Sequence, residues 1–191
     1  METISLLTKA RICHLVYHSH CGGVPLGAEQ SDKTYKLLFL NIGLLNNIRG
    51  IDWQTLSGYE GHQLVNEGGL AEQFVGTHLL DRAHGLEPPR LYYWLRKRKS
   101  ANAELDYVIN FGPRVIPVEV KSGKSGSLKS LQQFIHENGA ALGVRFDLNL
   151  PSFQAITHTI RTAEGNTPVS YKLLSLPLYA VEELDRLLRD L

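Results

Sequence analysis

Residues 103–121 read Ala-Glu-Leu-Asp-Tyr-Val-Ile-Asn-Phe-Gly-Pro-Arg-Val-Ile-Pro-Val-Glu-Val-Lys. Two apolar, β-rich runs, 103–109 and 115–121, flank a Gly-Pro turn, and this pattern predicts the two strands of a hairpin. A turn centred on Gly112 and Pro113 sets Asp106 opposite Glu119 in an antiparallel pair. The stretch therefore predicts two carboxylates that face each other across neighbouring strands.

Facing carboxylates are unusual in a sheet. Period-two alternation places Glu119 and Lys121 on one face of their strand, with Ile116, Val118 and Val120 on the other. Directly opposed side chains have Cβ atoms roughly 5 Å apart, and like charges there are destabilising. A hard divalent cation is the usual reason for such a pair. The interpretation depends on register, because a slip of one residue sends one partner to the other face.

The chemistry of such a site follows from its residue types. Mg²⁺, or Mn²⁺ in its place, is held by one or two carboxylates together with substrate oxygens and waters. In this interpretation Asp106 and Glu119 are direct ligands, and the backbone carbonyl of Val120 completes the set. The ion would activate a water and neutralise charge on a phosphodiester. Lys121 would orient that water or stabilise the developing negative charge.

Composition sets the bounds on this interpretation. The chain has 191 residues, of which 43% are hydrophobic and 20% charged, and its net charge is +1. This length suits one sizeable domain, or one domain with a small appendage. No global basic field indicates nucleic acid, but residues 96–99 read Arg-Lys-Arg-Lys beside the hairpin. That run is either a basic rim for phosphodiester chemistry or an ordinary solvated loop.

Targeting signals are lacking in the sequence. No apolar run approaches the roughly 20 residues of a membrane span. The first ten residues do not have the basic-then-apolar layout of a signal peptide. Two cysteines give no disulfide framework, which favours a reducing cytoplasm. We therefore expect a cytoplasmic protein without a membrane partner.

Periodicity and turn signals predict the other elements. Helices are expected at 2–9 and 62–84, from Ser125 to Gly139, and from Val181 onward. Strands are expected at 10–18, 35–40, 91–95, 140–146 and 171–176, with 19–33 as a loop and 150–168 unassigned. The alternation predicts an α/β fold with helices around a mixed sheet. We expect an N-terminal segment over 1–60, a small appendage, and an α/β domain over 61–191.

The order Asp106, then Glu119-Val120-Lys121, resembles the PD-(D/E)XK signature of the restriction-endonuclease-like superfamily. The resemblance implies a central mixed β-sheet flanked by helices and a metal-dependent nuclease site. The superfamily often places an acidic residue on the helix before the core hairpin, and Glu72 has that position. An acid on the inner face of a helix also needs a partner. The resemblance thus implies a site made of Glu72, Asp106, Glu119 and Lys121.

A closer resemblance covers roughly residues 1–150. It rests on five segments in order: 35–44, 70–75, 92–94, 104–109 and 116–123. These are similar to a family of unknown function that forms the C-terminal, nuclease-like domain of many bacterial and archaeal AAA-type ATPases. The family's first motif typically ends Phe-x-Asp-x-Gly-Leu, and Asn41 stands here in the Asp position. The ATPase module and winged-helix linker are missing, so the chain is expected to be a C-terminal fragment or a standalone remnant.

Nucleotide binding by the chain itself is not favoured. Gly123-Lys124-Ser125 looks like the end of a phosphate-binding loop, but such a loop needs glycine five positions before Gly123, where Val118 stands. The resemblance instead implies a separate ATPase module or another protein as partner, and DNA as a substrate.

Other residues have more ordinary interpretations. Glu104, opposite Lys121 in the predicted register, suits a cross-strand ion pair. Spacing argues against a zinc site made of Cys13, His14, His18, His20 and Cys21, because Cys13 and His14 point to opposite faces of a strand and no Cys-x₂-Cys pairing occurs. The aromatic residues Trp53, Tyr92, Tyr93 and Trp94 are expected in the core rather than stacked on bases.

Two hypotheses remain for the function. The first is a Mg²⁺-dependent nuclease domain. The second is a non-catalytic accessory domain that keeps the nuclease-like fold and binds DNA or a protein partner for an ATPase.

Overall fold

The computed structural model describes residues 2–51, 67–82, 89–96, 102–162 and 165–191. The described strands are β1 (Cys13–Ser19), β2 (Gln30–Phe39), β3 (Leu91–Arg96), β4 (Ala103–Phe111), β5 (Arg114–Val120), β6 (Leu142–Asp147), β7 (Ser152–Thr162) and β8 (Gly165–Pro177). The helices are α1 (Glu2–Lys9), α2 (Ile42–Ile48), α4 (Glu67–Asp81), α5 (Lys129–Asn138) and α6 (Leu184–Arg189), with short 3₁₀ helices η1 (Leu26–Glu29) and η2 (Leu178–Glu183).

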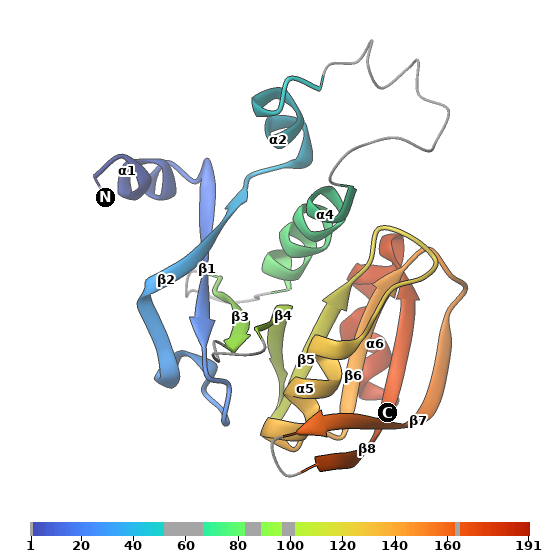
Figure 1. Cartoon of the computed structure of the whole chain (residues 1–191). Coiled ribbons are helices and arrows are strands. Elements are labelled where there is room, and N and C mark those ends of the chain that lie inside the picture. The colour runs from blue at the N-terminus through green and yellow to red at the C-terminus, as the bar shows by residue number, and fades with distance from the viewer. Residues whose placement is uncertain (1, 52–66, 83–88, 97–101, 163–164) are drawn as a thin grey trace.

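All eight of these strands belong to one sheet, in the order β2-β1-β3-β4-β5-β6-β8-β7 (Figure 1). The pairs β1–β3, β5–β6 and β6–β8 are parallel, and the remaining pairs are antiparallel. The predicted α/β fold with a central mixed sheet flanked by helices is confirmed. The N-terminal strands β1 and β2 are hydrogen-bonded into this same sheet, and the division at residues 60 and 61 stays a prediction.

The β4–β5 hairpin has the predicted register. Pairing runs from Phe111 opposite Arg114 at the turn to Tyr107 opposite Val118. Gly112 takes a positive φ of 57° in the turn, a conformation that glycine adopts without steric cost. The local turn therefore aligns the two strands as the sequence predicts.

Helices cover both faces of the sheet (Figure 1). One core contains buried residues of α4 and α6, among them Val75 and Leu188, packed against Val118 and Val120 of β5. The other core contains Leu131 and Phe134 of α5. Strand β5 is therefore buried on both faces, as expected for a central strand with a parallel neighbour.

Element boundaries differ from the predictions at several places, and α6 begins at Leu184 rather than at Val181, which lies in the 3₁₀ helix η2. Strand β2 begins at Gln30, inside the expected loop, and α5 begins at Lys129 rather than near Ser125. Residues 150–168, left unassigned, contain all of β7 and the start of β8. Strand β7 is largely exposed, so it carries no alternation of buried and exposed residues that a sequence pattern could detect. Gly139 ends α5 in the left-handed conformation, with a φ of 68°, as predicted.

The aromatic run of β3 lies in the core. Tyr92, Tyr93 and Trp94 are buried, and the Trp94 ring meets Phe134 edge to face with centroids 5.4 Å apart. The core interpretation is confirmed for these three residues. Trp53 and residues 97–99 of the basic run lie outside the described residues.

Candidate functional site

Asp106 lies at an irregularity in the sheet. In the β3–β4 ladder Tyr92 pairs with Val108 but Trp94 pairs with Leu105, so β4 contains an extra residue between these pairs. Such a β-bulge re-aims side chains at the end of a strand. The Asp106 carboxylate accepts a hydrogen bond from the main-chain N–H of Val120, 2.7 Å from Oδ2. Asp106 is therefore fixed against the strand that carries Glu119.

Glu119 is buried at the end of β5, with only 6% of its side chain exposed. Its Oε1 accepts a hydrogen bond from Lys121 Nζ at 2.6 Å, while its buried Oε2 has no hydrogen-bond partner among the described residues. Burial and the nearby charge of Asp106 raise the pKa of Glu119 to about 7. This carboxyl group therefore lacks a compensating positive charge or donor on one of its two oxygens.

The backbone at Gly126 passes close to the side chain of Lys121. A Cβ built on Gly126 would lie 2.6 Å from Lys121 Cδ, so only glycine leaves room for the lysine stem. The ammonium group of Lys121 forms an ion pair with the carboxylate of Glu119. The main-chain carbonyl oxygen of Phe146 accepts a hydrogen bond from the main-chain N–H of Lys121 at 2.8 Å. This bond joins the end of β5 to β6.

Glu72 is brought toward these residues by α4. Burial raises the pKa of Glu72 to about 7, and the next largest contribution is the negative charge of Asp106. The pKa of Asp106 is also raised, by burial, although the hydrogen bond from Val120 opposes this shift. The structure thus places the three sequence-predicted acids within electrostatic reach of one another at one end of the sheet.

Lys36 of β2 also belongs to this cluster of charged side chains. The sequence patterns did not predict it as a site residue. Its Nζ contacts Glu104 Oε1, lies 3.9 Å from Glu72 Oε2, and is 4.8 Å from the Tyr93 ring centroid. Although burial lowers the pKa of Lys36, the hydrogen bond and charge of Glu104 raise it above the usual value. The expected pairing of Glu104 with Lys121 is wrong, because Glu104 contacts Lys36 and Lys121 contacts Glu119.

The arrangement can hold a cation only in a restricted way. Within the described parts of the chain, no three or more His, Cys, Asp or Glu side chains form a group that could hold a metal ion. Mg²⁺ needs fewer protein ligands, since one or two carboxylates with waters and phosphate oxygens suffice. The unpartnered Oε2 of Glu119 beside Asp106 fits that smaller demand. Whether the Val120 carbonyl joins them stays a prediction.

Residues outside the cluster have structural partners. Asn41, at the family's Asp position, caps α2 by accepting the N–H of Leu44 at 2.9 Å. Cys13 and Cys21 are free and buried, and His18 Nε2 lies 3.1 Å from the carbonyl oxygen of Leu95. These contacts account for Asn41 and His18 without a bound ion.

Fold and site together define an α/β domain with a partly buried cluster of acids and lysines at one end of a mixed sheet. Residues 67–172 match the family described as "Domain of unknown function (DUF4143)". The match spans more than half of the sequence, and the chain belongs to this family. No curated protein and no solved structure matches the chain. No helix in the described part of the chain is long and apolar enough to cross a membrane.

Proposed function

We propose that this chain is a nuclease-like domain that hydrolyses phosphodiesters with Mg²⁺ or Mn²⁺ at Asp106, Glu119, Lys121 and Glu72. The observation that supports it best is the buried, unpartnered Oε2 of Glu119, next to the negative charge of Asp106. Folding a chain around such acids is unfavourable unless a cation or proton compensates them. Perturbed carboxylates of this kind concentrate at functional sites.

Each residue has a distinct part in this proposal. Asp106 and Glu119 would hold the ion, and Glu72 of α4 would contribute a further carboxylate. The ion would supply Lewis-acid activation of a water and of the phosphate. Lys121 would turn from Glu119 toward the phosphate oxygens, where an ammonium group stabilises developing negative charge. Lys36 keeps Glu72 and Glu104 partly neutralised and so limits repulsion within the cluster.

The proposal extends to the partners. The order of motifs and the sheet with flanking helices suit a restriction-endonuclease-like core. DNA is then the expected substrate, and a separate ATPase module is the expected protein partner.

The accessory role has its own support. Lys121 pairs with Glu119, and Lys36 pairs with Glu104 and approaches Glu72, so the two lysines offset much of the acidic charge without an ion. A domain with this arrangement could retain the fold and bind DNA or a protein partner without cleaving anything.

Cleavage assays separate the two roles. Plasmid and single-stranded DNA would be incubated with Mg²⁺ or Mn²⁺ and the wild type, Asp106→Asn, Lys121→Met or the control Glu2→Gln, which changes an exposed acid of α1. The nuclease proposal expects cleavage by wild type and control and loss of at least about a hundredfold in both site variants. Calorimetry would measure Mg²⁺ binding in parallel. No cleavage together with no metal binding would leave only the accessory role.

A further inference from the structure

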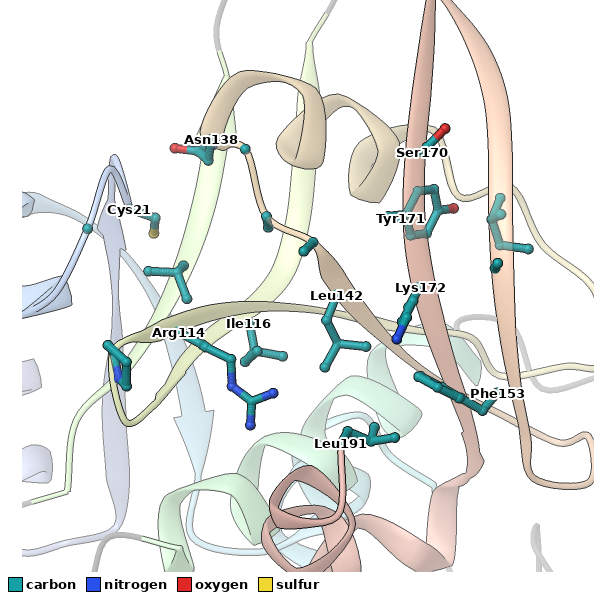
Figure 2. Close-up of a pocket in the computed structure, with 18 of the residues that line it drawn as sticks. Cys21, Arg114, Ile116, Asn138, Leu142, Phe153, Ser170, Tyr171, Lys172 and Leu191 are labelled. Atoms are coloured by element: carbon teal, nitrogen blue, oxygen red, sulfur yellow. The ribbon is translucent and has the colours of Figure 1, made fainter.

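A cavity lies at the turn end of the β4–β5 hairpin, away from the acids. It has a volume of about 690 Å³ and is lined by the hairpin turn, the start of β6 and the neighbouring parts of β7 and β8 (Figure 2). Pockets that hold small molecules are typically about 300–1,000 Å³. Its size therefore suits a small organic molecule rather than a single ion.

The walls of this pocket are largely apolar. Ile116, Leu142, Phe153 and Leu191 line one region of it, and their side chains gather around a common hollow in Figure 2. Phe153 keeps 44% of its surface exposed, so a large aromatic face is available there. An apolar ligand body would remove this surface from water, at roughly 25 cal/mol per Å².

Two cations flank the hollow. The side chains of Arg114 and Lys172 lie on either side of Ile116 and Leu142, with their nitrogen atoms directed into the same space (Figure 2). None of the residues that line the pocket is an aspartate or glutamate. The lining thus combines apolar walls with two positive charges and no acidic side chain.

The side chains of Arg114 and Lys172 contact uncharged groups among the described residues. Arg114 Nη2 donates to the carbonyl oxygen of Leu188 at 2.7 Å, and its guanidinium carbon lies 5.2 Å from the Phe111 ring centroid. Lys172 Nζ lies 5.6 Å from the Phe153 ring centroid. Among the described residues neither side chain forms an ion pair with a carboxylate. Their charges are therefore available to an anion.

We propose that this pocket binds a small amphipathic organic anion. The apolar body lies on Ile116, Leu142 and Phe153, and the carboxylate, sulfonate or phosphate head lies between Arg114 and Lys172. Charge-assisted hydrogen bonds from two cations orient the head group, and the apolar walls select against small, fully hydrated anions. This site is independent of the acids at the other end of the hairpin.

The test uses 8-anilinonaphthalene-1-sulfonate, a fluorescent amphipathic anion, titrated into the full chain. Two variants probe the pocket without altering the buried core. Lys172→Met removes one charge, and Ala155→Trp fills the cavity from an exposed position of β7. Lys33→Met, which removes an exposed lysine of β2, is the matched control. Thermal melting of each variant confirms that it is folded.

The expected result is saturable binding of one probe molecule by the wild type and by Lys33→Met. Lys172→Met should weaken that binding at least about fivefold, and Ala155→Trp should abolish it. Decanoate should displace the probe, whereas decanol, which has the same chain without the charge, should not. Equal affinity in Lys172→Met and wild type, or equal displacement by decanol, would overturn the proposal. Asp106→Asn should leave the affinity unchanged, which separates this site from the proposed nuclease site.

Discussion

The phenolic oxygen of Tyr107 donates a hydrogen bond to the main-chain carbonyl of Glu72, at a distance of 2.8 Å. Tyr107 follows Asp106 in β4, and Glu72 lies in α4, so this bond joins the helix to the strand that carries the neighbouring acid. Burial, followed by the charges of Glu72 and Asp106, raises the pKa of Tyr107 well above its usual value, which keeps the phenol protonated as a donor. This hydrogen bond therefore couples the position of Glu72 on α4 to that of Asp106 on β4.

Gly76 provides the space for this bond. A Cβ at this position would collide with the Tyr107 hydroxyl and lie 2.8 Å from Leu38 Cδ1. We expect Gly76→Ala to reduce the free energy of unfolding by about 1–3 kcal/mol, because overpacking must be relieved by shifts of buried groups. Urea denaturation measures the change. Gly68→Ala is the control, since a Cβ there meets nothing within 4 Å and alanine favours helix. Equal effects of the two substitutions would contradict this account.

Glu119 should make the fold less stable as the pH rises. Its pKa is about 7 in the folded chain and close to 4.5 when unfolded, so the folded state binds more protons between these values. The stability that this group provides is fully present below about pH 4.5 and is lost by pH 7. We expect Glu119→Gln to raise the free energy of unfolding at pH 8 in EDTA by on the order of 1 kcal/mol.

The gain from Glu119→Gln should shrink as the pH falls from 7 toward 4.5, where both side chains are neutral. Denaturation curves at pH 5, 6, 7 and 8 would follow it. The control Glu2→Gln, at an exposed position, should show no such trend. A gain that does not change with pH would show that burial of the charge is not its cause.

Mg²⁺ should stabilise the wild type if the acids hold it. A ligand that binds only the folded state at ten times its dissociation constant adds about 1.4 kcal/mol. We expect the melting temperature at pH 8 to rise with Mg²⁺ in the wild type but not in Asp106→Asn or Glu119→Gln. Differential scanning fluorimetry with stepped Mg²⁺ concentrations gives the readout. Equal shifts in all three proteins would place the binding elsewhere.

Gln73 ties α4 to the end of β2. Its side-chain oxygen accepts the N–H of Phe39 at 3.0 Å, and its side-chain nitrogen donates to the carbonyl of the same residue at 2.7 Å. Gln73→Leu would leave both main-chain groups without this partner, at a cost of about 1–3 kcal/mol. Gln133→Leu, which removes only an exposed hydrogen bond to Glu137, should cost less than about 0.5 kcal/mol. Amide exchange at Phe39 should accelerate in the first variant and not in the second.

The features that the sequence predicted correctly depend on residues close together along the chain. The register of β4 and β5 follows from a turn of two residues, and the end of α5 follows from Gly139, because each depends on neighbours in sequence. Lys36 could not be assigned to the acids in this way. Its contact with Glu104 joins β2 to β4 across a sheet in which β1 and β3 lie between them. No periodicity encodes such a long-range contact.

The β-bulge at Asp106 is a second feature that the sequence pattern does not predict. The turn at Gly112 and Pro113 predicts that Asp106 stands directly opposite Glu119, but the paired ladder ends at Tyr107 and Val118. Beyond it, the Asp106 side chain itself accepts the N–H of Val120. The extra residue arises from the mismatch between β4 and its other neighbour, β3, whose position is set by tertiary packing.

The parallel pairing of β1 with β3 has a consequence for the order in which the chain folds. Val16 pairs with Leu91, so this ladder must close a long loop, whereas Ile109 and Ile116 meet across a tight turn. Loop-closure entropy favours the tight turn. We expect Ile116→Val to slow folding, and Val16→Ala chiefly to speed unfolding, in stopped-flow measurements. Asp106 and Glu119 would then meet early, and the lysine of β2 would reach them only when the last strands dock.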